Sequence, residues 1–289
     1  YLVNNPYGQH KQEANDWLAK LDQERAAVRR RTPWFAGYNK NIVAEDPMAV
    51  LKTKNYTTDI ASMKDKVSEA EWEARVNLAA AYRLVALWGM DEMIANHISV
   101  RVPGEEDTFL INPYGYFYEE ITASSLIKID LDGNVVQKPD FDYEPNRAGF
   151  VIHSAIHRAR EDAHCVIHTH TPAGMAVSTM KCGLLPLTQT AMRFATIGYH
   201  DYQSVAVDLA EQESIVADLG DSDLLILRNH GLLTVAPSVA QAFSNIYRAE
   251  LACKVQVMAM SANTEIGTPP EAIIEKTNAL YRPETRRPF

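Results

Sequence analysis

The chain has 289 residues, of which 46% are apolar and 22% are charged, so it can bury a large core without disulfides or structural metals. Its 37 Asp and Glu against 28 Lys and Arg give a formal net charge of −9. This charge argues against nucleic acids and anionic membranes as partners, because both need a basic face. No run of about 18 apolar residues is present, so the sequence predicts no membrane-spanning helix. Three cysteines without a CxxC spacing predict buried, reduced thiols and a cytoplasmic protein.

Composition divides the chain into three parts. Residues 1–68 are charged and then turn-rich, and we interpret them as an amino-terminal arm. Residues 69–262 carry the regular helical and strand patterns of one core domain. Residues 263–289 contain four prolines and predict a looser carboxy-terminal arm.

Helical and strand patterns alternate along the core domain. Ser68 and Glu71 form a capping-box signal at the start of a helix that ends at Gly89. Two short strands and a hairpin around Asp132-Gly133 come next, and helices and strands then alternate, which predicts an α/β fold. The predicted strands are 98–102, 108–111, 127–136 (the hairpin), 165–170, 224–227 and 232–235, and the later helices are 148–160, 172–180, 214–220 and 237–260.

Three histidines lie where two predicted strands end. His168 and His170 are two positions apart on one strand, so their side chains share a face. His230 follows the second strand and precedes Gly231, which lets the backbone turn sharply. If the strands are neighbours, three imidazoles converge and leave coordination positions open, as a catalytic zinc or iron site requires. The alternative is that these histidines pack in the core or cap the strand ends.

Two further histidines, His153 and His157, are four positions apart on the predicted helix and share a face. The pattern offers no third ligand near them. We therefore expect them to pack against the sheet or a neighbour rather than to hold a metal.

Several motifs appear in an order and at spacings that resemble one known family. They are VIHTHTP at 166–172, LRNHGLL at 227–233, ISVR at 98–101, LINPYG at 110–115 and DLDG at 130–133. The chain resembles the class II aldolase/adducin family over roughly residues 70–260. The resemblance implies a three-layer α/β/α sandwich around a largely antiparallel sheet, and a homotetramer with active sites at subunit interfaces. It also implies a divalent metal on His168, His170 and His230, with zinc expected and iron, manganese or cobalt as alternatives.

The sequence departs from the sugar-phosphate aldolases of this family around the metal. By the resemblance, their acid/base Glu corresponds to Gly149, which cannot carry a proton. Their phosphate-loop glycine–asparagine pair corresponds to Asn96 and His97, and their proton-donating Tyr corresponds to Gln189. A substrate other than a sugar phosphate is therefore expected.

A carboxylic acid is the substrate class that the remaining candidates favour. Arg147 offers bidentate recognition of a carboxylate, although it also fits a surface arginine before a helix. Tyr114 stands in place of the family's Ser or Thr before Gly115 and, with His97, gives an aromatic pocket or a packing contact. His200 lies beside Asp201 and is a further candidate for the pocket.

The sequence thus predicts a metal-dependent lyase for a non-phosphorylated keto-, hydroxy- or aromatic acid, by decarboxylation or aldol-type cleavage through a metal-stabilised enolate. Decarboxylation is attractive because it needs no base, and His97 or Tyr114 is the expected proton donor to carbon. A non-heme iron oxygenase on the same three histidines is one alternative. A non-catalytic, adducin-like interaction module is another.

Overall fold

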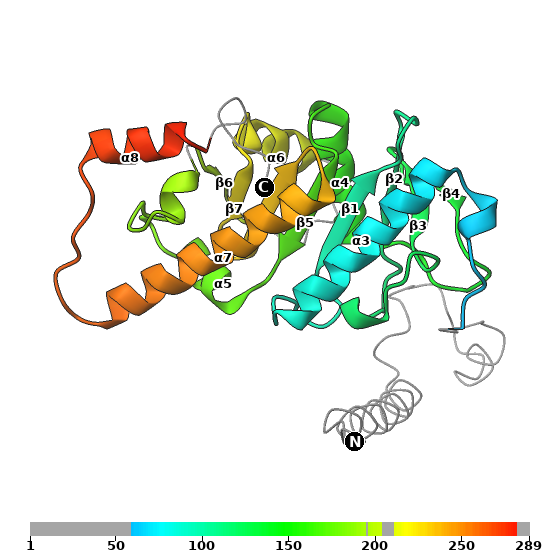
Figure 1. Cartoon of the computed structure of the whole chain (residues 1–289), viewed down its shortest axis with the longest axis horizontal. Coiled ribbons are helices and arrows are strands. Elements are labelled where there is room, and N and C mark those ends of the chain that lie inside the picture. Colours follow the sequence, from blue (N-terminus) through cyan, green and yellow to red (C-terminus); the bar gives the residue numbers. More distant parts are fainter. Residues whose placement is uncertain (1–58, 195, 204–210, 282–289) are drawn as a thin grey trace, which may run out of the picture. The chain divides into compact units, whose positions relative to one another are not determined.

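One mixed sheet of eight strands organises the described part of the chain, which comprises residues 59–194, 196–203 and 211–281 of the computed structural model (Figure 1). The strands are β1 (His97–Arg101), β2 (Thr108–Ile111), β3 (Ile127–Asp130), β4 (Val135–Gln137), β5 (Cys165–Thr169), β6 (Gly198–His200), β7 (Leu224–Leu227) and β8 (Gly231–Ala236). Their order is β4-β3-β2-β1-β5-β8-β7-β6, and every neighbouring pair is antiparallel except β6 and β7. The expected largely antiparallel sheet is confirmed.

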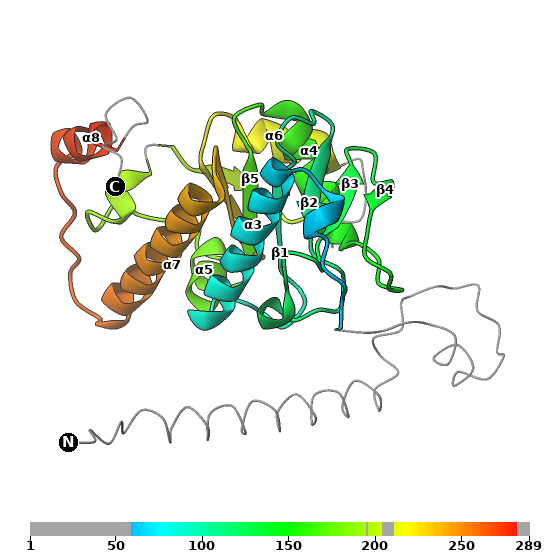
Figure 2. The same ribbon diagram turned by 45° about the vertical axis from the view of Figure 1, so that its right-hand side comes forward.

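Helices cover both faces of this sheet (Figure 2). Residues of α3 (Glu69–Leu87) and α7 (Val239–Ser261) share one buried apolar cluster with Cys165 and Ile167 of β5, and α5 (Pro172–Ser178) packs beside α7. Residues of α4 (Arg147–Ala159) and α6 (Gln212–Leu219) form a second cluster with Val166 of the same strand. Since successive strand residues face opposite sides, β5 contributes to both cores, and the three-layer α/β/α fold is confirmed.

Short polar residues begin three of the helices. The side chains of Ser68, Asn146 and Ser238 accept hydrogen bonds from backbone amides in the first turns of α3, α4 and α7. These bonds satisfy amides that have no partner inside the helix. Each cap therefore fixes the residue at which its helix begins.

The structure describes little of the predicted amino-terminal arm and most of the predicted carboxy-terminal arm. The amino-terminal arm lies outside the described residues up to residue 58. The carboxy-terminal segment, expected to be loose, contains helix α8 (Glu271–Ala279). Asn278 of α8 is buried, and its amide donates to the carbonyls of Met192 and Arg193. Pro270 is one of the prolines that predicted a loose arm, and it lies at the amino-terminal end of this helix.

The cysteine prediction is correct for two residues of three. Cys165 and Cys253 are buried and free, whereas Cys182 is free but exposed. Cys182 lies in the turn after α5, where no core surrounds it. Within the described helices, none combines the length and apolar composition needed to cross a membrane.

The Glu71 carboxylate does not complete the predicted capping box. Ser68 accepts from the Glu71 amide as expected. The Glu71 side chain instead pairs with Arg75 Nε and Lys128 Nζ, both at 2.8 Å. Arg75 is 0% exposed, so the pairing with Glu71 compensates a charge that has left water.

Replacing Glu71 with Ala is expected to destabilise the fold by about 3–5 kcal/mol, because it leaves the buried Arg75 charge uncompensated. Glu73→Ala, which removes an exposed carboxylate from the same helix, is the matched control. Urea unfolding of both variants measures the difference. Equal stability of the two variants would contradict this account of the pair.

Candidate metal centre

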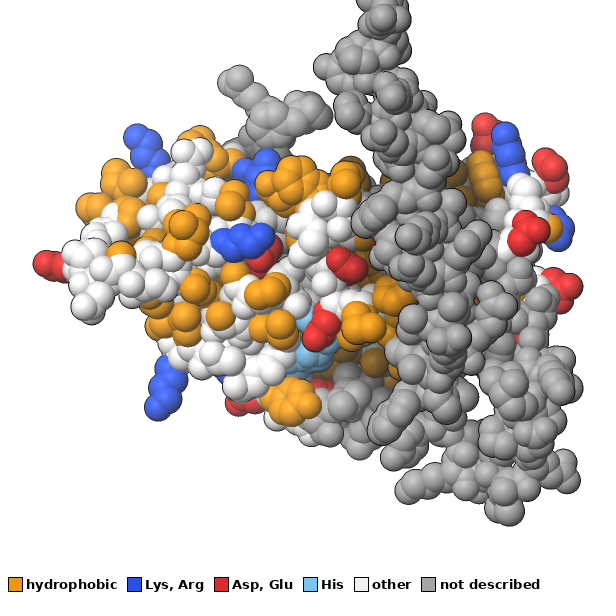
Figure 3. Space-filling model, turned by 90° about the horizontal axis from the view of Figure 1, so that it is seen from below, with side chains coloured by type: hydrophobic (Ala, Val, Ile, Leu, Met, Phe, Trp, Pro, Cys, Tyr) orange, Lys and Arg blue, Asp and Glu red, His pale blue; other side chains and the backbone are white. Residues whose placement is uncertain are grey.

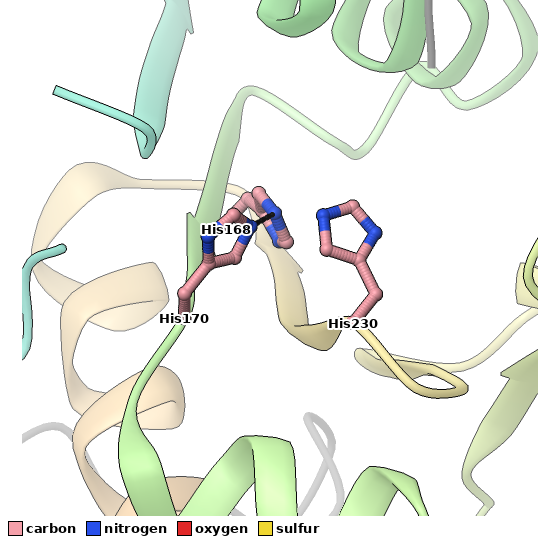
Figure 4. A group of neighbouring side chains, drawn as sticks. All are labelled: His168, His170 and His230. Carbon is pink, nitrogen blue, oxygen red and sulfur yellow. Dashed lines mark hydrogen bonds between the residues drawn. The ribbon is translucent and has the colours of Figure 1, made fainter. Parts of the chain in front are cut away.

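The three predicted histidines converge at one end of β5 (Figure 4). Their ligand nitrogens all lie within 4.8 Å of one another, and the three pairs of ring centroids are 4.6–4.7 Å apart. His168 is on β5, His170 follows its last residue, and His230 lies in the turn between β7 and β8. β5 and β7 are not direct neighbours, but β8 lies between them and pairs with both, so their ends still come together.

The outer nitrogens of two rings are fixed by groups that can only accept a hydrogen bond. His168 Nδ1 donates to the Leu232 carbonyl at 2.9 Å, and His170 Nδ1 donates to the Glu92 carboxylate at 2.7 Å. A neutral imidazole with a proton on Nδ1 carries a lone pair on Nε2. The two Nε2 atoms face each other at 2.8 Å. Two facing lone pairs repel, and a cation bound between them removes that repulsion, so this donor set fits a metal ion.

A strained turn brings the third ring to the other two. Asn229 has a positive φ of 58°, which Asn tolerates better than most residues. At Gly231, a Cβ atom would lie 2.5 Å from the Thr169 carbonyl, so only glycine permits this approach of β8 to β5. The sequence Asn-His-Gly therefore places His230 against the end of β5.

Burial favours the neutral form of His168 and His230. Burial, together with the neighbouring His170 and His200, lowers the pKa of His230 to about 4. Burial, followed by His170 and His230, also holds the pKa of His168 well below its usual range. Neutral imidazole is the form that binds a metal. His170 and His230 are partly exposed, and Figure 3 shows histidine side chains reaching the surface beside acidic and hydrophobic groups.

A buried carboxylate holds the chain that follows His170. Glu250 of α7 is buried and accepts hydrogen bonds from the Thr171 hydroxyl and, at 3.1 Å, from the Gly174 amide. It thereby fixes the first turn of α5 directly after β5 and His170. Glu92 and Glu250 are the supporting residues that sequence reasoning missed. Each lies far from the histidines in the chain, so no local motif announces it.

His97 lies beside the cluster, and Asn96 precedes it in the chain. His97 is the cross-strand partner of His168, and their ring centroids are 4.8 Å apart. Asn96 is buried, and its Oδ1 accepts from the Glu92 amide. Its Nδ2 has no hydrogen-bond partner among the described residues.

The position of Gly149 is closed to any larger side chain. A Cβ atom there would lie 2.8 Å from His97 Cγ and 2.8 Å from Ile111 Cδ1. His97 therefore occupies the space next to the position where the resemblance expects an acid/base Glu.

The other predicted residues make no described contact with the three histidines. Tyr114 is 48% exposed, and Gly115 follows it with a positive φ of 98°. Arg147 is exposed in the first turn of α4. The Gln189 amide donates to the Tyr281 hydroxyl at 2.8 Å, away from the cluster.

His200 is buried and held between two carboxylates, Asp218 at 2.8 Å and Glu211 at 3.1 Å. Its ring nitrogens are thus both engaged. It lies near enough to His230 to contribute to the lowered pKa of that residue.

Comparison with known proteins gives a consistent result. The family described as "Class II Aldolase and Adducin N-terminal domain" matches residues 76–257. A Caulobacter vibrioides protein named for aldolase class 2 is 56% identical over 224 residues, which cover 77% of this chain and 82% of the relative. Rat alpha-adducin is 44% identical over 215 residues, and the match covers 74% of this chain but only 29% of adducin. The solved L-fuculose 1-phosphate aldolase of Glaciozyma antarctica is 29% identical with a TM-score of 0.68, covering 79% of this chain and 89% of that one.

Substitution of Gly149 by Ala is expected to lower the free energy of unfolding by about 1–3 kcal/mol, because the added methyl overlaps His97 and Ile111. Gly267→Ala is the control, since a Cβ atom there meets nothing within 4 Å. Thermal or urea unfolding measures both. A Gly149→Ala protein as stable as the control would refute the close contact.

Proposed function

Because the chain belongs to the class II aldolase and adducin family, we propose that it is a metal-dependent carbon–carbon lyase for a non-phosphorylated keto-, hydroxy- or aromatic acid. The observation that carries the proposal is the convergence of His168, His170 and His230, with two Nε2 lone pairs aimed at one point. A scaffold with no need for a metal has no reason to keep two such lone pairs face to face.

We propose that these three histidines hold a divalent metal. Three neutral nitrogen ligands suit zinc, and iron, manganese or cobalt are alternatives. When bound, the ion supplies a Lewis acid that stabilises negative charge developing on a substrate oxygen. Glu92 orients His170, and the Leu232 carbonyl orients His168, so both rings are preorganised for the ion.

The surrounding residues favour decarboxylation over aldol cleavage. Gly149 leaves no carboxylate at the position of the aldolase base, and loss of carbon dioxide needs none. We assign carboxylate binding to Arg147, whose exposed guanidinium makes no described hydrogen bond. Asn96 offers a free amide donor for a substrate oxygen. Tyr114 is the proposed proton donor to carbon.

Gly115, Gln189 and His200 keep lesser roles in this proposal. Gly115 lets Tyr114 turn outward, and His200 tunes the charge at His230. Gln189 is bound to Tyr281 next to α8, so a role in the site requires that side chain to leave this partner.

The family resemblance further favours a homotetramer with active sites at subunit interfaces. Large apolar side chains are exposed at the end of α3 and on α7, among them Leu87 at 78% and Met258 at 72%. Burying them against another subunit would remove apolar surface from water. A cytoplasmic location is proposed from the three free cysteines.

A non-catalytic, adducin-like interaction module is the second candidate. The 44% identity to rat alpha-adducin over 74% of this chain favours it. It differs from the lyase in what it requires of the histidines, since an interaction module needs no bound metal.

Purified protein is expected to bind about one divalent ion per chain, and His230→Ala to lose it, because one of three ligands is gone. Glu92→Ala should weaken metal affinity by about 10–100-fold through loss of the hydrogen bond that orients His170. Glu92→Gln keeps an acceptor and should recover part of the affinity. Elemental analysis and competition with a chelator measure this, with Glu73→Ala as control. Absence of metal from wild-type protein after loading would support the adducin-like module.

Metal-loaded protein is expected to release carbon dioxide from a member of a panel of keto-, hydroxy- and aromatic acids, and His230→Ala to lose this activity. The panel is run beside sugar phosphates, with oxygen uptake recorded in the presence of iron. Cleavage of a sugar phosphate without carbon dioxide release would replace decarboxylation by aldol chemistry. Oxygen uptake with iron would instead favour the oxygenase.

A further inference from the structure

A chain of buried hydrogen bonds runs from the metal centre into the layer between the sheet and α4. His97 Nδ1 contacts His153 Nε2 at 2.8 Å, and His153 Nδ1 contacts Ser99 Oγ at 2.6 Å. Ser99 Oγ also contacts His157 Nε2 at 2.7 Å, and His157 Nδ1 ends the chain on the Ala163 carbonyl at 2.8 Å. All four side chains are at most 1% exposed.

This chain of hydrogen bonds forms because the residue spacing on β1 matches the residue spacing on α4. His97 and Ser99 are two positions apart on β1, so both face α4. His153 and His157 are one helical turn apart on α4, so both face β1. The four groups therefore alternate between strand and helix. The expectation that His153 and His157 pack against the sheet is correct, and the structure adds what they bind there.

The carbonyl at the far end sets the direction of every bond. A carbonyl only accepts, so His157 Nδ1 carries a proton and, in a neutral ring, its Nε2 accepts. Ser99 then donates to His157 and accepts from His153 Nδ1. It follows that His153 Nε2 is unprotonated and accepts from His97 Nδ1. His97 Nδ1 therefore carries a proton, and in the neutral ring His97 Nε2 carries a lone pair.

This reasoning requires His153 and His157 to be neutral. Burial, together with the nearby Arg101 guanidinium, lowers the pKa of His157 to about 3. Burial also holds the pKa of His153 well below its usual range. No described hydrogen bond or ion pair brings a carboxylate to either ring. Both rings are therefore uncharged at neutral pH.

We propose that Ser99, His153 and His157 are positioning residues that hold His97 as its Nδ1–H tautomer, so that Nε2 presents a fixed lone pair beside the metal centre. Nε2 of His97 makes no hydrogen bond within the described residues, and its ring is 4.8 Å from that of His168. His97 is not one of the three histidines assigned to the metal, so we assign its lone pair to a substrate hydroxyl.

The proposal also narrows the expected substrate class, and only this statement about the substrate rests on the proposed function. A lone pair held at Nε2 accepts a hydrogen bond from a substrate hydroxyl, which favours hydroxy-aromatic acids over keto acids that lack a hydroxyl group. It also changes the role expected for His97, because in this tautomer Nε2 has no proton to give to carbon. The chain does not conduct protons to solvent, because it ends on a carbonyl that can only accept.

Nitrogen-15 NMR of histidine-labelled, metal-free protein at neutral pH tests the tautomer directly, with His97→Gln to assign the signals. The expected result is that His97, His153 and His157 each show a protonated Nδ1 and an unprotonated Nε2. Ser99→Ala should break the chain and convert His97 from one tautomer to a mixture of both. Ser99→Thr keeps the hydroxyl and should restore the single tautomer.

Ser154→Ala is the matched control, because it removes a buried hydroxyl of α4 that bonds Gln212 and takes no part in the chain. It should leave the His97 signals unchanged. A wild-type His97 with a protonated Nε2, or one unaffected by Ser99→Ala, would overturn the proposal. The wild-type spectrum decides even if Ser99→Ala fails to fold. Because the sample is metal-free, this result is independent of whether the three-histidine cluster binds a metal.

Discussion

The register of three antiparallel strands is the constraint on which the site depends. β1 pairs with β5 so that His97 lies opposite His168, and β5 pairs with β8 so that His168 lies opposite Leu233. A slip of one residue in either pair would turn the histidines to the opposite face of the sheet. The apolar residues that alternate with them, such as Ile98 and Ile167, resist this slip because they fill the core under α3 and α7. Core packing on one face therefore fixes polar geometry on the other.

The polar layer between β1, β5 and α4 obeys a strict hydrogen-bond constraint. His97, His153 and His157 are at most 1% exposed there, so a ring N–H left without an acceptor would cost about 1–3 kcal/mol. Protein acceptors consequently fix the Nδ1 proton of His168 and His170, just as the serine–histidine chain fixes that of His97. Three Nε2 lone pairs are thereby left in one region. Their common orientation is a property of the whole layer and not of any one residue.

Sequence reasoning recovered the elements that carry local signals. Alternation predicted that His168 and His170 share a face, and Asn-His-Gly predicted the turn at His230. It failed where a partner comes from a distant element. Nothing near Glu71 in the chain shows that its carboxylate pairs with Lys128, and nothing near His170 points to Glu92. The helix α8 was missed for a related reason, since its contact through Asn278 is tertiary. Family resemblance supplied the topology, which no local pattern contains.

The replacement of a carboxylate by an imidazole changes the charge of the site. Gly149 brings no carboxylate to the site and His97 and Asn96 carry no negative charge, so Glu92, bonded to His170, is the described carboxylate in hydrogen-bond contact with the cluster. A divalent ion on the three histidines would outweigh this single negative charge and leave the site locally positive. Such a site attracts an anion, although the chain as a whole carries a net charge of −9. The net charge of the whole chain therefore says little about the substrate. The local charge at the site determines which substrate can bind.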